Sequence, residues 1–220
     1  ISFLLRTVDA LPVYRRIDSG EDVSQNLKTF EAARDLLRRG GSIAIFPEGV
    51  SHNSPGLLPI KTGAARIALG AASLGDEPID IRIVPVGLFY TSKTTFRSEA
   101  LLHFGDSFPV PRVKLDDSSD PPRDAVREVT SQIEIALRDV TLNAETDAEI
   151  AAADVAHSVF AADDEARLDS KLAFLRNYVR TANSGSLPPE FSRLGERLRR
   201  FDEKLDAIGI GPEHLSLARF

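Results

Sequence analysis

The strongest constraint on the fold is a short apolar run that ends abruptly at a turn. Ile43–Phe46 is rich in β-branched and aromatic residues, and the tripeptide Pro47-Glu48-Gly49 follows it directly. Such a run is typical of a buried strand that delivers polar groups to the edge of a sheet. Lys61 then precedes a small-residue helical pattern, which would place a cation and free backbone N–H groups near the turn. Together these groups are suited to binding an anion.

The first half of the chain alternates between strand and helix patterns. Helices are predicted over 22–39, where apolar residues recur at helical spacing before two glycines, and over 61–73, which is rich in Ala and Gly. Short apolar runs predict strands at 10–14, 43–46, 81–86 and 100–104. Alternating strands and helices predict an α/β domain over residues 1–115, with a mostly parallel sheet flanked by helices.

The second half of the chain has a different pattern. A linker rich in Asp, Ser and Pro covers 116–122, where Asp120 or Ser119 would cap the helix that follows. Apolar stripes at helical spacing predict helices over 122–142, 147–160, 165–181 and 190–208. We therefore expect an all-helical C-terminal region over residues 116–220.

Four blocks of sequence resemble the glycerol-phosphate acyltransferase family, which includes the lysophosphatidic acid acyltransferases. In chain order they are Leu11-Pro12-Val13-Tyr14-Arg15, Phe46-Pro47-Glu48-Gly49, Lys61-Thr62-Gly63 and Ile83-Val84-Pro85-Val86-Gly87. The Glu-Gly-x-Ser-His form of the second block is similar to the branch that acylates glycerol 3-phosphate or dihydroxyacetone phosphate. The resemblance covers residues 11–110 and implies a glycerol-3-phosphate acyltransferase-like α/β fold.

The resemblance implies roles for residues in the first two blocks. Arg15 would contact the substrate phosphate, because a planar guanidinium suits bidentate contact with phosphate oxygens. Arg16 is the alternative, since a shift of one residue turns the side chain to the other face of a strand. Glu48 would hold a glycerol hydroxyl or order the phosphate-binding groups, or it would simply stabilise the turn. Gly49 would let the backbone approach a ligand or adopt a positive φ.

The end of the second block departs from the family's common Thr-Arg-Ser. Ser51 and His52 stand there, so a phosphate contact usually made by arginine would pass to His52 or Lys61. Lys61 resembles the lysine ahead of the family's small-residue helix, where the ammonium and the helix N-terminus act on one phosphate. The alternatives are that His52 only caps a surface loop and that Lys61 is an ordinary exposed lysine. The substrate-binding candidates are therefore Arg15, Glu48, Gly49, Ser51, His52 and Lys61.

The family's catalytic signature, a His followed five positions later by an Asp, does not occur in this chain. The residues five positions after His52, His103, His157 and His214 are Leu57, Phe108, Ala162 and Arg219. The chain also opens at Ile1 and holds no methionine. We therefore interpret it as a fragment and expect the His-x4-Asp pair upstream of Ile1. No catalytic residue is assigned in this chain, and the 220 residues alone are expected to be inactive.

The resemblance implies a reaction as well as a fold. A fatty acyl group would pass from acyl-CoA or acyl carrier protein to a hydroxyl of glycerol 3-phosphate, dihydroxyacetone phosphate or a lysophospholipid, in phospholipid biosynthesis. The missing His would act as general base, and neither a metal nor a cofactor is called for. The block that ends at Gly87 would line the acyl side of the site or pack in the core. Association with a membrane surface, on its cytoplasmic side, is expected through parts outside this chain.

Charge and composition narrow the classes of partner. The net charge is −6, and residues 1–110 hold 12 of the 27 basic and 12 of the 33 acidic residues, so the excess acidity lies downstream. A neutral half suits a small phosphorylated substrate, whereas nucleic-acid binding needs a stripe of positive charge, and no nucleic-acid partner is expected. The most apolar region, 57–74, is interrupted by Lys61 and Arg66, which argues against a membrane-spanning helix.

Two other functions stay open. The segment from Gly49 to Asn53 nearly matches the Gly-x-Ser-x-Gly nucleophile elbow of α/β-hydrolases, which would make Ser51 the nucleophile of an esterase, although Asn53 breaks the pattern. The second alternative is a non-catalytic acyltransferase-like module whose acidic helical region docks a partner. A P-loop is excluded, because Ile60 stands where that motif requires Gly.

Overall fold

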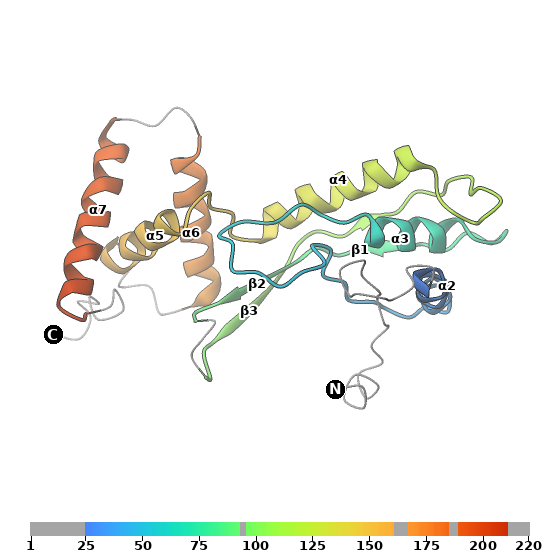
Figure 1. Ribbon diagram of the computed structural model, residues 1–220, viewed down its shortest axis with the longest axis horizontal. Coiled ribbons are helices and arrows are strands. Elements are labelled where there is room, and N and C mark those ends of the chain that lie inside the picture. Colours follow the sequence, from blue (N-terminus) through green and yellow to red (C-terminus); the bar gives the residue numbers. More distant parts are fainter. Residues whose placement is uncertain (1–24, 93–95, 161–166, 185–188, 211–220) are drawn as a thin grey trace. The chain divides into compact units, whose positions relative to one another are not determined.

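The computed structural model describes residues 25–92, 96–160, 167–184 and 189–210, and helices dominate this part of the chain (Figure 1). The helices are α2 (Gln25–Arg38), α3 (Gly63–Ser73), α4 (Arg123–Val140), α5 (Asp147–Phe160), α6 (Leu168–Ala182) and α7 (Pro189–Ala207). The strands are β1 (Arg82–Ile83), β2 (Val86–Tyr90), β3 (Ala100–Phe104) and β4 (Phe108–Pro109).

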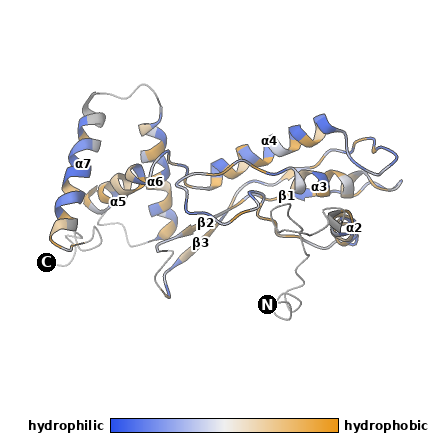
Figure 2. Cartoon of the chain, in the orientation of Figure 1, coloured by the Kyte–Doolittle hydropathy of each residue, from blue (hydrophilic) through white to orange (hydrophobic). Residues whose placement is uncertain are grey.

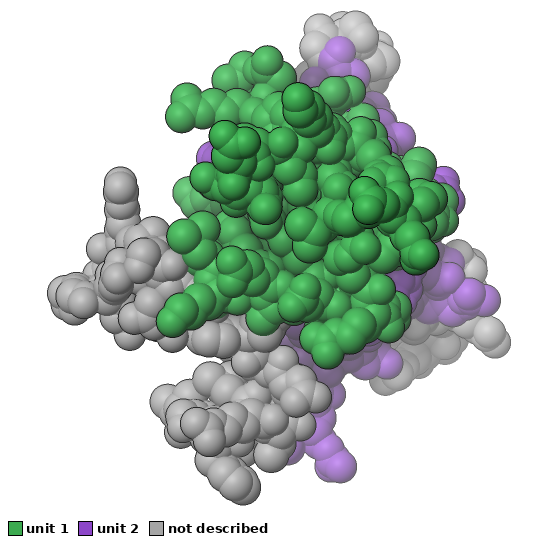
Figure 3. Space-filling model, turned by 90° about the vertical axis from the view of Figure 1, so that its right-hand side faces the viewer, with its two compact units in different colours: residues 1–49, 60–84, 107–134 green, residues 50–59, 85–106, 135–220 purple. Residues whose placement is uncertain are grey.

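The chain divides into two compact units (Figure 3). The first unit consists of residues 1–49, 60–84 and 107–134, and the second of residues 50–59, 85–106 and 135–220. Each unit combines segments that are distant in the sequence. α2, α3, β1 and β4 belong to the first unit, whereas β2, β3, α5, α6 and α7 belong to the second.

The expected mostly parallel sheet is wrong, because the strand pairs of the described residues are antiparallel. β2 pairs with β3, with Leu88 opposite Leu102, and β1 pairs with β4. The connection 91–99 between β2 and β3 suits a hairpin and is too short for the crossover that a parallel pair needs. The strand predicted at 81–86 is split, since Pro85 has no N–H to donate to a ladder. The described fold is therefore mostly helical, with two small two-stranded sheets.

Residues 43–46 form no strand, contrary to the prediction. Within the described residues no strand pairs with them. Ile45 and Phe46 are 42% and 74% exposed, so the run on which the prediction rested is not buried here. An apolar, β-branched run shows that a segment suits an extended conformation, but a ladder also needs a neighbouring strand, which the run does not specify.

The predicted helices are confirmed where the structure describes them. α5 coincides with the range predicted for it, and α2, α3, α4, α6 and α7 differ from their predicted ranges only at the ends. Hydrophilic and hydrophobic residues alternate along α4 (Figure 2). Its buried stripe consists of Val126, Val129, Ile133, Leu137 and Val140. The strand predicted at 10–14 lies outside the described residues.

In the first unit, α2 packs on a surface of α3 that consists of small residues. Phe30 of α2 lies beside Gly63, where an added Cβ would be 3.9 Å from the phenyl ring. Arg34 crosses α3 at Gly70, where an added Cβ would clash with the guanidinium. One turn later, Arg38 donates to the Ala71 carbonyl at 3.1 Å. The Ala and Gly content of α3 therefore allows side chains of α2 to reach its backbone.

The core of the second unit consists of two adjoining clusters between helices. The first joins Ala144 and Ala153 to Leu175 and Val179, and the second joins Val155 and Ala156 to Leu198. Phe174 and Tyr178 of α6 pack against both clusters, and burial raises the pKa of the Tyr178 hydroxyl. Phe89 of β2 packs on the first cluster, so the β2–β3 hairpin is attached to the helical core.

Candidate functional site

Two of the family-like sequence blocks meet in the first unit. The residues Phe46-Pro47-Glu48-Gly49 form a turn in which the Gly49 N–H donates to the Phe46 carbonyl at 3.2 Å, with Gly49 at φ 73°. The Lys61 N–H donates to the Pro47 carbonyl at 2.8 Å. An added Cβ at Gly49 would lie 3.4 Å from Lys61 Cγ, so the stem of Lys61 runs past this turn. Glu48, in the same turn, is half-buried.

Lys61 also stands just ahead of the N-terminus of α3. Thr62 at the N-cap makes no side-chain capping hydrogen bond, and the first turn holds no acidic residue. The first helical hydrogen bond runs from the Arg66 N–H to the Thr62 carbonyl at 3.0 Å. The N–H groups before it have no acceptor within the helix. The exposed Lys61 ammonium and this helix end therefore make a positive region that suits a phosphate.

Ser51 and His52 lie in the second unit, in the loop formed by residues 50–59. His52 Nδ1 accepts the Ser54 N–H at 3.1 Å, so this ring nitrogen acts as an acceptor within the loop. His52 is half-buried and Ser51 is exposed. The bond to Ser54 is what a loop-capping histidine would make, and a phosphate contact of His52 stays a prediction.

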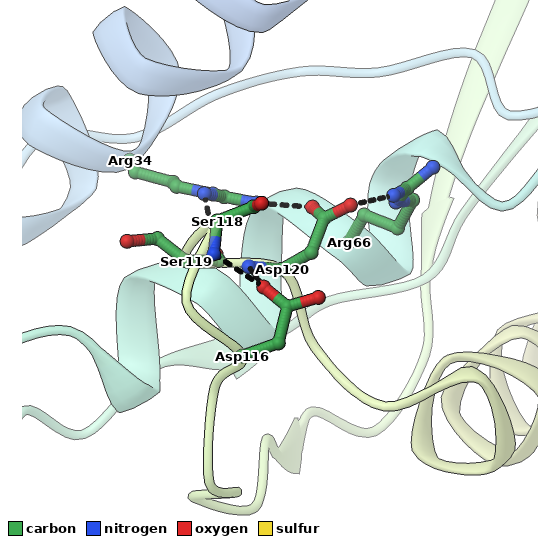
Figure 4. Close-up of polar contacts among 6 residues, drawn as sticks. All are labelled: Arg34, Arg66, Asp116, Ser118, Ser119 and Asp120. Atoms are coloured by element: carbon green, nitrogen blue, oxygen red, sulfur yellow. Dashed lines mark hydrogen bonds and ion pairs between the residues drawn. The ribbon is translucent and has the colours of Figure 1, made fainter.

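A carboxylate that the sequence marked only as a possible helix cap joins two arginines of the first unit (Figure 4). Asp120 lies 3.5 Å from Arg34 Nη2 through one oxygen and pairs with Arg66 through the other. Arg34 also donates to the Ser119 carbonyl at 3.0 Å. The Arg34 side chain is 8% exposed and that of Arg66 is 38% exposed. We call these three charged residues the Arg34–Asp120–Arg66 cluster; it ties α2 and α3 to the segment that precedes α4.

The loop that carries Asp120 is closed by Asp116 (Figure 4). One carboxylate oxygen of Asp116 accepts the N–H groups of Ser118 at 2.9 Å and of Asp120 at 2.8 Å. The Asp116 carbonyl accepts the Ser119 N–H at 2.9 Å, and Ser119 has φ 59°. Because these bonds fix the loop, the Asp120 carboxylate reaches the two arginines from a defined backbone position.

The structure brings some of the predicted site residues together and not others. Glu48, Gly49 and Lys61 share one turn and its neighbouring helix end, whereas Ser51 and His52 belong to the loop 50–59. Arg15, with its alternative Arg16, lies outside the described residues. Substrate binding by the six candidates stays a prediction.

The Arg34–Asp120–Arg66 cluster was not predicted from the sequence. One signal was available: Arg34 follows Phe30 by four residues and so falls on the face predicted to be apolar in α2. An arginine on a buried face needs a partner, because a buried charge must be paired. The identity of that partner could not be read from the sequence, since Asp120 is 86 positions further along the chain.

The described residues offer neither a cluster of metal ligands nor a membrane-spanning helix. They contain no group of three or more His, Cys, Asp or Glu side chains that could hold a metal ion. None of the helices in that part of the chain combines the length and the apolar character that crossing a membrane requires. The whole sequence lacks cysteine, so thiolate chemistry is not available to a site built from this chain.

Known proteins resemble this chain over much of its length. Residues 1–88 match the family model described as Acyltransferase. The chain is 40% identical to Glycerol-3-phosphate O-acyltransferase 2 of Saccharomyces cerevisiae over 54% of its length, and 38% identical to Glycerol-3-phosphate O-acyltransferase 1 of that yeast over 48%. It is also 30% identical to an uncharacterized acyltransferase of Schizosaccharomyces pombe over 82% of its length. No solved structure matches it.

The chain spans a small part of each of these relatives, namely 16%, 14% and 27% of their lengths. The family match includes all four of the sequence blocks that carry the resemblance, from Leu11 to Gly87. The resemblance drawn from those blocks is confirmed. Residues 1–88 of this chain therefore belong to the acyltransferase family.

Proposed function

We propose that this chain is part of an enzyme that transfers a fatty acyl group from acyl-CoA or acyl carrier protein to a hydroxyl of a phosphorylated glycerol-type acceptor. Glycerol 3-phosphate is the acceptor that we favour, ahead of dihydroxyacetone phosphate and a lysophospholipid. The reaction would serve phospholipid biosynthesis. The enzyme would work at a membrane surface, on the cytoplasmic side, through parts outside this chain.

The observation that carries this proposal is the 40% identity to a yeast protein named as a glycerol-3-phosphate O-acyltransferase. The geometry of the first unit supports it. Lys61 and the uncapped start of α3 offer positive charge and N–H donors, and the Gly49 turn offers backbone that has no side chain of its own and lies beside the stem of Lys61. A charge-assisted hydrogen bond to a phosphate is worth about 1.5–3 kcal/mol.

In this scheme the residues of the chain act by positioning the acceptor. Lys61 and the N–H groups of α3 would hold the phosphate, and the Glu48 carboxylate would accept a hydrogen bond from a glycerol hydroxyl. Holding the hydroxyl oxygen next to the thioester carbonyl carbon lowers the entropic part of the activation barrier. The hydroxyl proton would pass to the histidine of a His-x4-Asp pair, which these 220 residues do not contain. As the new ester C–O bond forms, the thioester C–S bond would break, and the histidine would return the proton to the departing thiolate of coenzyme A or acyl carrier protein.

Acyl transfer to a phosphorylated acceptor is the first prediction. In an active protein that contains these residues, labelled acyl groups from acyl-CoA are expected on glycerol 3-phosphate faster than on dihydroxyacetone phosphate or lysophosphatidate. Product analysis by thin-layer chromatography measures this. Hydrolysis of simple esters without an acceptor, together with labelling of Ser51 by a covalent serine probe, would instead establish the esterase alternative.

Lys61→Ala in the same protein should raise the KM for the phosphorylated acceptor by about 10- to 100-fold, because the loss of one charge-assisted hydrogen bond weakens binding by that factor. The KM for acyl-CoA should stay nearly constant. Lys28→Ala is the matched control, because Lys28 is an exposed lysine of α2 in the same unit. Equal increases in the KM values of acceptor and donor would remove Lys61 from the phosphate site.

A further inference from the structure

The loop 50–59 is attached to the junction between α4 and α5 in the second unit. The Leu57 N–H donates to Asn143 Oδ1 at 3.1 Å, and the Ala144 N–H donates to the Pro55 carbonyl at 3.2 Å. Gly56 lies between these two bonds, where an added Cβ would be 3.0 Å from the Ala144 carbonyl oxygen. The loop and the junction therefore run in close backbone contact, with hydrogen bonds in both directions.

Asn143 is the side chain that makes this attachment specific. Its amide nitrogen lies 2.9 Å from Thr141 Oγ1, 3.1 Å from the Arg138 carbonyl and 3.2 Å from the Thr141 carbonyl, so it binds the last turn of α4. Its amide oxygen is then directed at the Leu57 N–H. A side chain with one donor end and one acceptor end is needed to bind the helix and the loop at once. Asp offers no donor in its charged form, and Ala offers neither group.

The junction itself is fixed by the helical core. Ala144 is 8% exposed and packs with Ala153 of α5 and with Leu175 and Val179 of α6. Because Ala144 is part of that cluster, its N–H and the neighbouring Asn143 side chain occupy defined positions. The helical C-terminal region thus supplies a packed base for the loop.

We propose that Asn143 is a positioning residue for Ser51 and His52: through Leu57 it holds the loop that carries them, so the helical core of the second unit sets where these two candidate acceptor-binding side chains lie within that unit. This rests on the proposed function. Ser51 and His52 follow the Glu48-Gly49 turn directly and stand in the block where the family usually has an arginine for the phosphate. A loop free to move would spread these side chains over many positions, and binding would then cost the entropy of ordering it.

Amide hydrogen exchange of the full chain tests the attachment without any assay of activity. In Asn143→Ala, the Leu57 amide should exchange about tenfold faster, because its acceptor is gone. Amides of the buried residues in α6 should keep their rates. Asn183→Ala is the matched control, since Asn183 is an exposed amide of the same unit, and it should leave Leu57 unchanged. An unchanged Leu57 rate in Asn143→Ala would overturn the proposal.

Kinetics then separate positioning from a merely structural role. In an active protein that contains these residues, Asn143→Ala should raise the KM for the phosphorylated acceptor about tenfold and leave both kcat and the KM for acyl-CoA close to the parent values. A purely structural loss would lower the active fraction, so kcat would fall while the acceptor KM stayed constant, and the proposal would be wrong. Absence of acyl transfer in the parent protein would refute the proposed function instead, whatever the exchange of Leu57 shows.

Discussion

Asp120→Asn is expected to lower the free energy of unfolding of the first unit by about 3 kcal/mol, the lower end of the cost of breaking a buried ion pair. Arg34 would be left as a charge with an 8% exposed side chain and without its carboxylate partner. Arg66 shares the same carboxylate. Once that carboxylate is neutral, the guanidinium groups of Arg34 and Arg66 would repel each other with no negative charge between them. The lower end of the range applies because Asp120 is 27% exposed and Arg66 is 38% exposed, so water compensates part of the loss.

Exchange rates of buried α3 amides, such as that of Leu69, report this change for the first unit alone. Asp124→Asn is the matched control, because Asp124 is 97% exposed and lies 3.9 Å from an exposed arginine, and it should change the stability by less than about 0.5 kcal/mol. If both variants had the same effect, the cluster would contribute nothing beyond surface charge.

A second change separates the charge effect from a packing effect. Arg34→Leu in the Asp120→Asn background removes the unpaired charge, so the double variant should be less destabilised than the sum of the two single variants. Additive effects of the two changes would show that the ion pair drawn between Arg34 and Asp120 in Figure 4 does not couple the two residues energetically.

The helices were predictable from the sequence because each one carries its own evidence. The stripe from Val126 to Val140 in α4 recurs at helical spacing whatever else the chain contains, and it is buried as that spacing requires. α5 has the range predicted for it for the same reason. Local periodicity is enough for a helix, since its hydrogen bonds lie within the segment.

The sheets were not predictable to the same degree, because a strand finds its hydrogen bonds elsewhere in the chain. Residues 43–46 have the composition of a buried strand, yet Phe46 is 74% exposed in the structure. The pairing of β2 with β3 follows from the short connection 91–99, a feature that was in the sequence and outweighs the apolar character of the strands.

The candidate site shows the same division. The meeting of Lys61 with the Gly49 turn follows from a local pattern, a strand-like run that ends in Pro-Glu-Gly ahead of a small-residue helix. The Arg34–Asp120–Arg66 cluster and the contact of Asn143 with Leu57 join residues that are 54 to 86 positions apart. No local rule of propensity or capping identifies such pairs, because they form only when segments that are distant in the sequence pack together.

Gly87 belongs to a family-like block, and the structure shows that it packs closely against the end of α4. It is buried in β2, and an added Cβ would overlap the Val140 carbonyl oxygen and lie 2.7 Å from the carbonyl carbon at the end of α4. Gly105 approaches Val140 as well, but its added Cβ would meet the Cγ1 atom at 2.6 Å. One glycine thus faces the backbone of α4 and the other mainly a side chain.

Gly87→Ala should therefore destabilise the second unit by about 2–3 kcal/mol, because backbone cannot move aside without shifting β2 or α4. Thermal unfolding measures this loss. Gly195→Ala is the matched control, since an added Cβ in α7 would make an ordinary contact at 3.6 Å, and alanine there should stabilise the helix by about 0.5–1 kcal/mol.

Truncation of Val140 distinguishes the two kinds of clash. Val140→Ala removes the atom that Gly105→Ala would meet, so that pair of changes should cost less than the sum of the single changes. The same truncation leaves the Val140 carbonyl in place, so with Gly87→Ala the costs should simply add. Rescue of Gly87→Ala by Val140→Ala would show that the alanine at position 87 clashes with the Val140 side chain and not with its backbone. The close contact between β2 and the backbone at the end of α4 would then be wrong.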